Sequence, residues 1–264
     1  MTPSTVATRL VSRRRQLAGA AVVAVALGLL GMLYAALAPA GQAATSADPA
    51  IDRGRELYNQ GCSSCHGFAG VGGSNAPSLI GVGAAAVDFQ VGTGRMPAAV
   101  KRAPQMPRKR PHYDEQQILD LAAYVSSLGA GPAIPSFAEA DWQKADTAYG
   151  GALFRTNCAQ CHNFAGSGGA LTSGKYAPSL SDATPRQIYE AMITGPENMP
   201  VFGDKQITPD QKLAIINYVR TIKTQADPGG AGLGRVGPVS ETVVGWLVGI
   251  GVLVVVTIWI GARA

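Results

Sequence analysis

A short motif of two cysteines and a histidine, Cys-x-x-Cys-His, occurs twice in this chain of 264 residues. The first copy, CSSCH, begins at Cys62, and the second, CAQCH, begins at Cys158. Together they hold all four cysteines and two of the three histidines. Any fold for this chain must explain why two thiols and an imidazole are needed at the same spacing in two places.

The similarity between the two halves extends well beyond the cysteines. Cys-x-x-Cys-His-x-Phe-Ala-Gly-x-Gly-Gly spans 62–73 and 158–169, and Ala-Pro-Ser-Leu follows at 76–79 and 177–180. Thr-Gly and then Met-Pro follow in both halves. Apolar residues spaced by three and four then close each half, which predicts amphipathic helices. These are Ile118, Leu121, Ala122, Val125 and Leu128 in the first half, and Leu213, Ile216, Val219 and Ile222 in the second.

We therefore predict a mainly α fold with two tandem units, each reading helix, motif, glycine-rich loop, short helix, Met-Pro loop, helix. Gly54 and Gly150, eight residues before each motif, predict a close crossing of the first and last helices of each unit. A unit of under 100 residues with few large apolar side chains needs a bulky group to complete its core. The predicted segments are a signal peptide or membrane anchor at 1–47, units at 48–130 and 141–226, linkers at 131–140 and 227–240, and a transmembrane helix at 241–261.

Charge and hydropathy place the two ends of the chain at a membrane. Residues 48–241 contain 17 basic and 17 acidic residues, so the formal net charge of +5 comes from five arginines near the ends. A balanced central region argues against nucleic-acid binding, and the terminal arginines suggest a cytoplasmic membrane surface. The apolar run at 17–37 is long enough to cross a bilayer, about 30 Å. It fits a signal peptide or a retained anchor, and both place the central region outside the cytoplasm.

The Cys-x-x-Cys-His motif indicates covalent attachment of a c-type heme. A single zinc ion held by four thiolates leaves the histidines unexplained, and so do disulfides within each pair. A thioredoxin-like pair would need a βαβ context, which is absent. We predict two covalent heme c groups, tethered by Cys62, Cys65, Cys158 and Cys161, with His66 and His162 as iron ligands.

The second iron ligand is predicted to be a methionine in each unit. Met199 fits this role in the second unit, where Met192 has the spacing of a packing residue. In the first unit both Met96 and Met106 precede a proline, and we favour Met96 because it shares the Thr-Gly context of Met199. We interpret His112 as an exposed loop histidine, and the alternative is a bis-histidine site. A thioether opposite histidine raises the reduction potential, which suits the oxidising end of a respiratory chain.

Two further patterns concern the surroundings of the hemes. The carbonyls of Pro77 and Pro178 are predicted to accept the ring N–H of the histidine ligands, which would fix the tautomer. A basic insertion at 101–110 occurs in the first unit alone. It is either a solvated loop or a docking surface for an acidic partner or a heme propionate.

With these motifs, the chain resembles the diheme cytochrome c subunit (cytochrome cc) of the actinobacterial cytochrome bc complex. The resemblance covers nearly the whole chain and is carried especially by VGTGRMP at 91–97, SGKYAP at 173–178 and the Gly-Ala-Arg ending. It implies two class I cytochrome c domains and supports Met96 as a ligand. It also implies a cytochrome b subunit, a Rieske iron–sulfur subunit and an aa3-type cytochrome c oxidase as partners, in a menaquinol-oxidising supercomplex of the plasma membrane. Electrons would pass from the Rieske protein to the dicopper centre of the oxidase, with the hemes outside the cytoplasm and the carboxy terminus inside.

Two other functions fit the same motifs. A free, membrane-tethered shuttle resembling cytochrome c4 would deliver electrons to another reductase, and a diheme peroxidase would keep one iron open to ligands. No set of residues resembles an acid–base or nucleophilic site, so we predict an electron-transfer subunit of a quinol–cytochrome c oxidoreductase with no catalytic site of its own.

Overall fold

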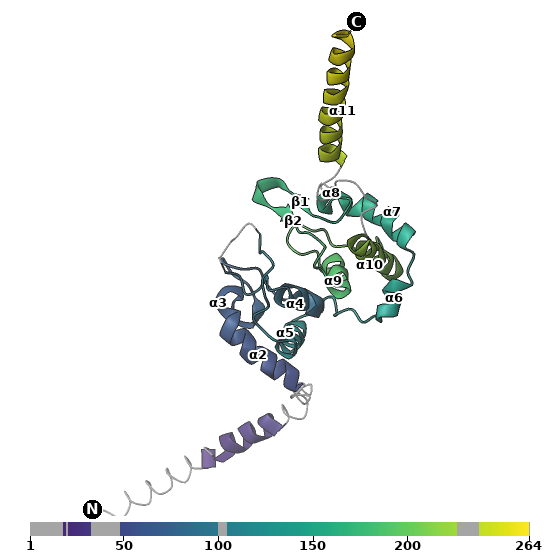
Figure 1. The fold of residues 1–264 in the computed structure, drawn as a ribbon. Helices are drawn as coiled ribbons and strands as arrows, with labels where there is room; N and C mark the ends of the chain where they lie inside the picture. Colours follow the sequence, from purple (N-terminus) through teal and green to yellow (C-terminus); the bar gives the residue numbers. More distant parts are fainter. Residues whose placement is uncertain (1–17, 20, 33–47, 100–104, 226–237, 264) are drawn as a thin grey trace, which may run out of the picture. The chain divides into compact units, whose positions relative to one another are not determined.

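The computed structural model describes residues 18–19, 21–32, 48–99, 105–225 and 238–263 (Figure 1). The chain divides into two units, Met1–Ala47 and Asp48–Ala264, and each is considered by itself. In the first unit the described part of the predicted apolar segment is a helix, Ala21–Met32. The remainder of that segment lies outside the described residues.

The first repeat is a group of helices around one apolar core, as the sequence predicted. Its elements are α2 (Pro49–Gly61), α3 (Ser63–His66), η1 (Phe68–Gly70), α4 (Gly83–Gly92) and α5 (Glu115–Ser127). Asp114 caps α5 in a reciprocal pair of hydrogen bonds with Gln117, so this helix begins where its apolar stripe begins. The core consists of Tyr58, Val87, Val91, Ile118, Leu121, Ala122, Tyr124 and Val125.

The second repeat has the same order of main helices with a small hairpin added. Its elements are α6 (Glu139–Gln143), α7 (Thr147–Asn157), α8 (Ala159–His162), β1 (Gly169–Ala170), η2 (Thr172–Gly174), β2 (Tyr176–Ala177), α9 (Pro185–Thr194) and α10 (Pro209–Thr224). Strands β1 and β2 are antiparallel, with Gly169 opposite Ala177. The sequence pattern did not predict this hairpin. The core consists of Phe154, Ile188, Met192, Ile207, Ile215, Ile216 and Val219.

Glycine allows the first and last long helices of each repeat to cross closely, as predicted. A Cβ atom on Gly54 of α2 would overlap the carbonyl oxygen of Asp120 in α5. A Cβ atom on Gly150 of α7 would overlap the carbonyl oxygen of Ala214 in α10 in the same way. The two crossings therefore depend on the absence of a side chain at matched positions.

The two repeats meet where α4 packs against α9. The Arg186 guanidinium of α9 contacts the Asp88 carboxylate of α4 at 2.7 Å. The loop after the first Met-Pro also reaches the second repeat. There the side-chain amide of Gln105 donates to the carbonyl of Tyr176 and accepts from its N–H, both at 2.7 Å.

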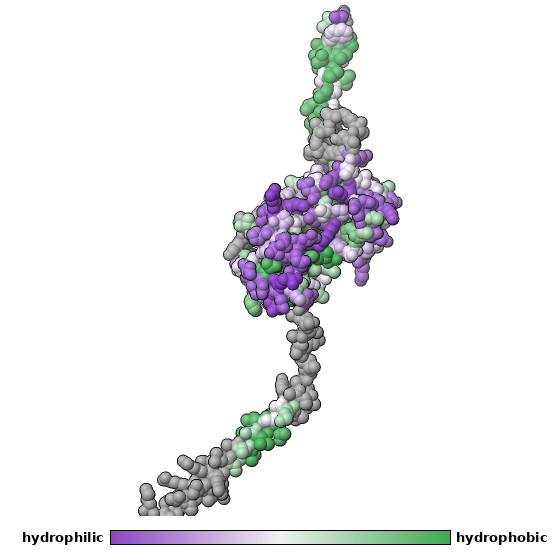
Figure 2. Space-filling view, turned by 60° about the horizontal axis from the view of Figure 1, so that its bottom comes forward, coloured by the Kyte–Doolittle hydropathy of each residue, from purple (hydrophilic) through white to green (hydrophobic). Residues whose placement is uncertain are grey.

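Helix α11 (Pro238–Gly261) is apolar along its length (Figure 2). Thr242–Gly261 is the one candidate membrane span among the described residues, with a mean hydropathy of 2.6. Its 20 residues reach about 30 Å, the thickness of a bilayer core. The predicted transmembrane helix is thus present as a helix of sufficient length.

Candidate functional site

Each Cys-x-x-Cys-His motif forms a single helical turn at the end of a longer helix. The carbonyl of Cys62 accepts the N–H groups of Cys65 and His66 at 3.1 and 3.0 Å. The carbonyl of Cys158 accepts the N–H groups of Cys161 and His162 at 3.1 and 2.9 Å. One turn therefore brings two thiols and an imidazole together, because residues three and four apart share one side of a helix.

The first thiol of each motif lies in surroundings that disfavour its thiolate form. All four cysteines, which lie among the described residues, are free. Burial, followed by the neighbouring thiol, raises the pKa of Cys62 and of Cys158 to about 11. A thiolate is the form that binds zinc or reacts in redox exchange, so this environment disfavours both. Among the described residues, no group of three or more His, Cys, Asp or Glu side chains could hold one metal ion.

Both histidines are buried and oriented by a proline carbonyl, as the sequence predicted. The Nδ1 atom of His66 lies 2.8 Å from the Pro77 oxygen, and that of His162 lies 3.0 Å from the Pro178 oxygen. When Nδ1–H donates to the carbonyl, Nε2 keeps a free lone pair for a metal. Burial lowers the pKa of His162, opposed by the Pro178 contact, and this favours the neutral ring that coordination needs.

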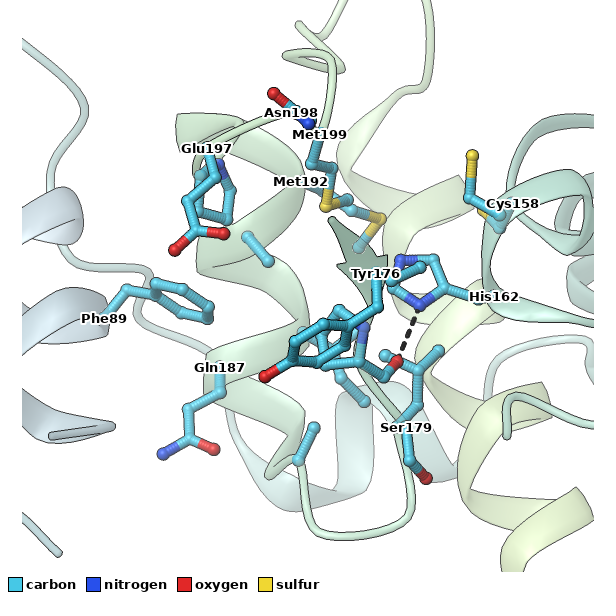
Figure 3. A pocket seen from close by; sticks show the side chains of 18 of the residues that line it. Phe89, Cys158, His162, Tyr176, Ser179, Gln187, Met192, Glu197, Asn198 and Met199 are labelled. Carbon is cyan, nitrogen blue, oxygen red and sulfur yellow. Dashed lines mark hydrogen bonds between the residues drawn. The ribbon is translucent and has the colours of Figure 1, made fainter. Parts of the chain in front are cut away.

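A cavity of about 510 Å³ opens beside the second motif (Figure 3). Cys158, Cys161 and His162 line it, and apolar side chains such as Ile188 and Val219 form much of its wall. A volume between 300 and 1,000 Å³ with few polar groups is typical of cofactor sites. The cavity therefore has the size and the chemistry for a large apolar group bonded to both thiols.

The candidate methionine ligands occupy different surroundings in the two repeats. Met192 and Met199 both line the cavity, and Figure 3 shows their side chains pointing into the space beside His162. Met192 is 2% exposed and belongs to the core, whereas Met199 lies in a loop. In the first repeat, Met96 is partly buried and packs against the apolar core, as Cys62 does. The N–H of Met106 instead donates to Glu197 of the second repeat at 2.7 Å.

His112 and residues 105–110 of the basic insertion lie among the described residues. His112 is exposed, with its ring edge against Tyr113 at a centroid distance of 4.9 Å. Lys101 and Arg102 lie outside the described residues. Arg108 is exposed and lines the cavity of the second repeat.

The sequence reasoning missed that the first repeat contributes to the cavity of the second. Phe89 and Arg95 line this cavity, and the Arg95 guanidinium lies 4.9 Å from the Phe89 ring centroid. Burial lowers the pKa of Arg95, with Glu197 opposing and Arg108 adding to this shift. The sequence feature that could have indicated this contribution was the basic insertion at 101–110, because Arg95 lies just before it.

Comparison with known proteins agrees with this geometry. A family model described as "Cytochrome C oxidase, cbb3-type, subunit III" matches residues 49–125 and again residues 145–219. The "Cytochrome bc1 complex cytochrome c subunit" of Corynebacterium diphtheriae is 46% identical over 95% of both chains. The subunit of the same name from Mycobacterium bovis is 45% identical over 95% of this chain and 92% of its own. This chain belongs to the family of cytochrome bc1 complex cytochrome c subunits.

As a member of this family the chain is a c-type cytochrome, and the residues described fit heme c. Cys158 and Cys161 are paired on one turn, burial raises the pKa of Cys158 to about 11, Nδ1 of His162 lies 3.0 Å from the Pro178 oxygen, and the cavity wall is mainly apolar. Heme c, when bound, supplies a one-electron ferrous–ferric couple. The cysteine pairs would supply the attachment points, and the contacts of His66 and His162 with proline carbonyls would orient the imidazoles.

Proposed function

We propose that this chain is the membrane-anchored diheme electron carrier of a cytochrome bc1-type menaquinol oxidase complex. In this role it accepts electrons from the Rieske iron–sulfur subunit and delivers them to the dicopper centre of an aa3-type cytochrome c oxidase. The observation that carries the proposal is the duplication of the motif turn and of its histidine–proline contact. Both repeats place two thiols on one turn, with the histidine Nδ1 at 2.8 and 3.0 Å from a proline carbonyl.

The ligand set follows the same symmetry. Cys62 and Cys65 would tether one heme, with His66 and Met96 as its axial ligands. The packing of Met96 against the core of the first repeat, and the contact of Met106 with the second repeat, support this choice. Cys158, Cys161, His162 and Met199 would hold the second heme. With two protein ligands on each iron, no position stays open for a substrate.

The arrangement of the chain supports its placement at the membrane. We place repeats 48–130 and 141–226 on the extracytoplasmic side, with α11 as the anchor and Arg263 at the cytoplasmic end. The guanidinium of Arg263 lies 4.6 Å from the Trp259 ring centroid. Trp and Arg are typical residues of the membrane–water interface.

The test combines three measurements on protein purified from the membrane in mild detergent. Mass analysis should find two covalently attached hemes per chain, and co-purification should find cytochrome b, Rieske and oxidase subunits. Carbon monoxide should leave the reduced spectrum unchanged. A chain that purifies alone with two hemes would indicate a tethered shuttle, and ready carbon monoxide binding would indicate a heme enzyme such as a peroxidase. A chain without covalent heme would refute the proposal.

A further inference from the structure

The cavity of the second repeat is closed partly by residues of the first repeat. Phe89, Thr93, Arg95, Gln105 and Arg108 line it, together with the residues of the second motif. In Figure 3, Phe89 and Cys158 lie at opposite ends of the cavity. The side away from the cysteines is therefore the side that faces the first repeat.

Positive charge is concentrated in this contribution from the first repeat. Arg95 is only 8% exposed, and among the described residues no carboxylate lies within ion-pair distance of it. Arg108 lines the same cavity and adds a second cation. Glu197 also lines it, but its Oε1 accepts the N–H of Met106 at 2.7 Å. Glu197 therefore offsets part of the positive charge without pairing directly with Arg95. A buried cation without a direct ion pair is costly, so this site can accept an anion that enters the cavity.

Heme c carries such anions on a defined edge. Its two propionate groups lie on the edge of the macrocycle opposite the two thioether-linked carbons. Because Cys158 and Cys161 hold the thioether edge, the propionate edge must point away from them. Arg95 lies on that side of the cavity, 4.9 Å from the Phe89 ring centroid, and Arg108 lines the same cavity.

We propose that Arg95 and Arg108 of the first repeat bind the propionates of the heme held by the second repeat. This inference rests on the proposed function, because it requires a heme at Cys158 and Cys161. Guanidinium groups suit this role because their planar donors match carboxylate oxygens in pairs. The first repeat then completes the cofactor site of the second, and the two repeats cannot separate without exposing it.

The expected consequence is an effect on one reduction potential. A cation near the propionates stabilises the heme that has gained an electron, so its removal favours the ferric state. We expect Arg95→Gln to shift the ferrous–ferric equilibrium of the second-repeat heme about tenfold, which lowers its potential by about 59 mV for one electron. Arg108→Gln should give a smaller shift in the same direction, because Arg108 is exposed. Arg95→Lys keeps the charge and should restore most of the potential.

The two hemes can be distinguished in a Met199→His background. Replacing a thioether by imidazole lowers the potential, so the lower wave of a spectroscopic redox titration then belongs to the second repeat. The control is Arg55→Gln, which removes an exposed guanidinium paired with Asp52 on α2. The full chain should be used in detergent, after mass analysis has verified two hemes.

The outcomes separate this inference from the proposed function. A wild-type chain without a heme on the second motif would refute the function, and the inference with it. If both hemes are present and the second-repeat heme has the same potential in Arg95→Gln, Arg108→Gln and Arg55→Gln, the inference is wrong but the proposed function stands. A change in the potential of the first-repeat heme alone would also overturn the inference, because Arg95 would then act through the adjacent Met96. Arg108→Gln keeps the test decisive if Arg95→Gln does not fold.

Discussion

Replacing Glu190 by glutamine should make the protein more stable at alkaline pH. Glu190 lies on α9 with no exposed surface, at the contact with α4. Its Oε1 accepts from Arg186 at 3.3 Å, whereas the same guanidinium contacts Asp88 more closely, at 2.7 Å. One cation therefore serves two carboxylates, and the buried one has the weaker contact.

Burial, followed by the proximity of Asp88, raises the pKa of Glu190 to about 9. Its Oε2 has no partner as a carboxylate oxygen, but the protonated acid can donate a hydrogen bond to Asp88. The folded protein thus holds a proton that the unfolded chain, with a glutamate pKa near 4.5, releases. The stability from this proton is complete below about pH 4.5 and is lost as the pH rises toward 9.

The size of the effect follows from the same linkage. Each pH unit between the two pKa values costs at most about 1.4 kcal/mol, so wild type should lose up to about 4 kcal/mol between pH 5 and 8. Glutamine keeps the shape and a donor to Asp88 without a titratable proton. The free energy of unfolding of Glu190→Gln should therefore depend less on pH. At pH 8 it should exceed that of wild type by about 1–3 kcal/mol, after about 1 kcal/mol is allowed for altered hydrogen bonding.

The assay is guanidinium unfolding of the full heme-loaded chain in detergent at pH 5, 6.5 and 8, followed by far-ultraviolet circular dichroism. Glu56→Gln is the matched control, because Glu56 is an exposed glutamate on α2. Its profile should follow wild type. If wild type and Glu190→Gln lose stability equally between pH 5 and 8, Glu190 is ionised in the folded protein and the reasoning is wrong.

The other predictions concern the helix crossing and the choice of ligand. Gly150→Ala forces a methyl group into the Ala214 carbonyl and should cost about 3 kcal/mol of unfolding free energy. Gly73→Ala has open space and should change stability by less than about 0.5 kcal/mol in the same denaturation assay. Met96→Leu should remove about half of the thioether-to-iron absorption of the ferric protein, whereas Met106→Leu should leave it intact. The reverse result would make Met106 the ligand.

Local pattern predicted most of the architecture within each repeat. The spacing of three and four predicted α5 and α10, and the structure contains both helices. The prediction was less accurate for individual residues of α10. Leu213 and Ile222 are only half-buried, whereas Ile215, which the pattern omitted, is 2% exposed. A stripe predicts which face of a helix is buried, but neighbouring elements determine how wide the buried face is.

The glycines and the proline carbonyls were predictable for a different reason. Gly54 and Gly150 occupy the same offset from their motifs, and Pro77 and Pro178 share the sequence Ala-Pro-Ser-Leu at different offsets. Two copies of one unit act as a comparison within a single sequence, so a shared residue indicates a shared geometric need. Both the helix crossings and the contacts to histidine are present in the structure.

Contacts between the repeats could not be predicted in this way, because the two copies differ where they meet. Phe89 and Glu190 occupy equivalent positions, each four residues before a threonine whose hydroxyl donates to their carbonyl oxygens, at 2.6 and 2.7 Å. One position places a ring in the neighbouring cavity, and the other places a carboxyl group against Asp88. No local sequence pattern indicates which residues of one repeat contact the other repeat.

This asymmetry has a consequence for electron transfer. Helices α4 and α9 each lead directly into the loop that holds a candidate methionine ligand, Met96 or Met199, and these helices form the contact between the repeats. A change in the packing of α4 on α9 must therefore move both loops, whereas a change at α2 or α7 reaches only one repeat. Substitutions at this contact should alter both heme potentials together, and substitutions at the glycine crossings should alter one. The proposed diheme carrier would gain from such a shared support, because the same two helices would hold both candidate ligand loops at a fixed separation.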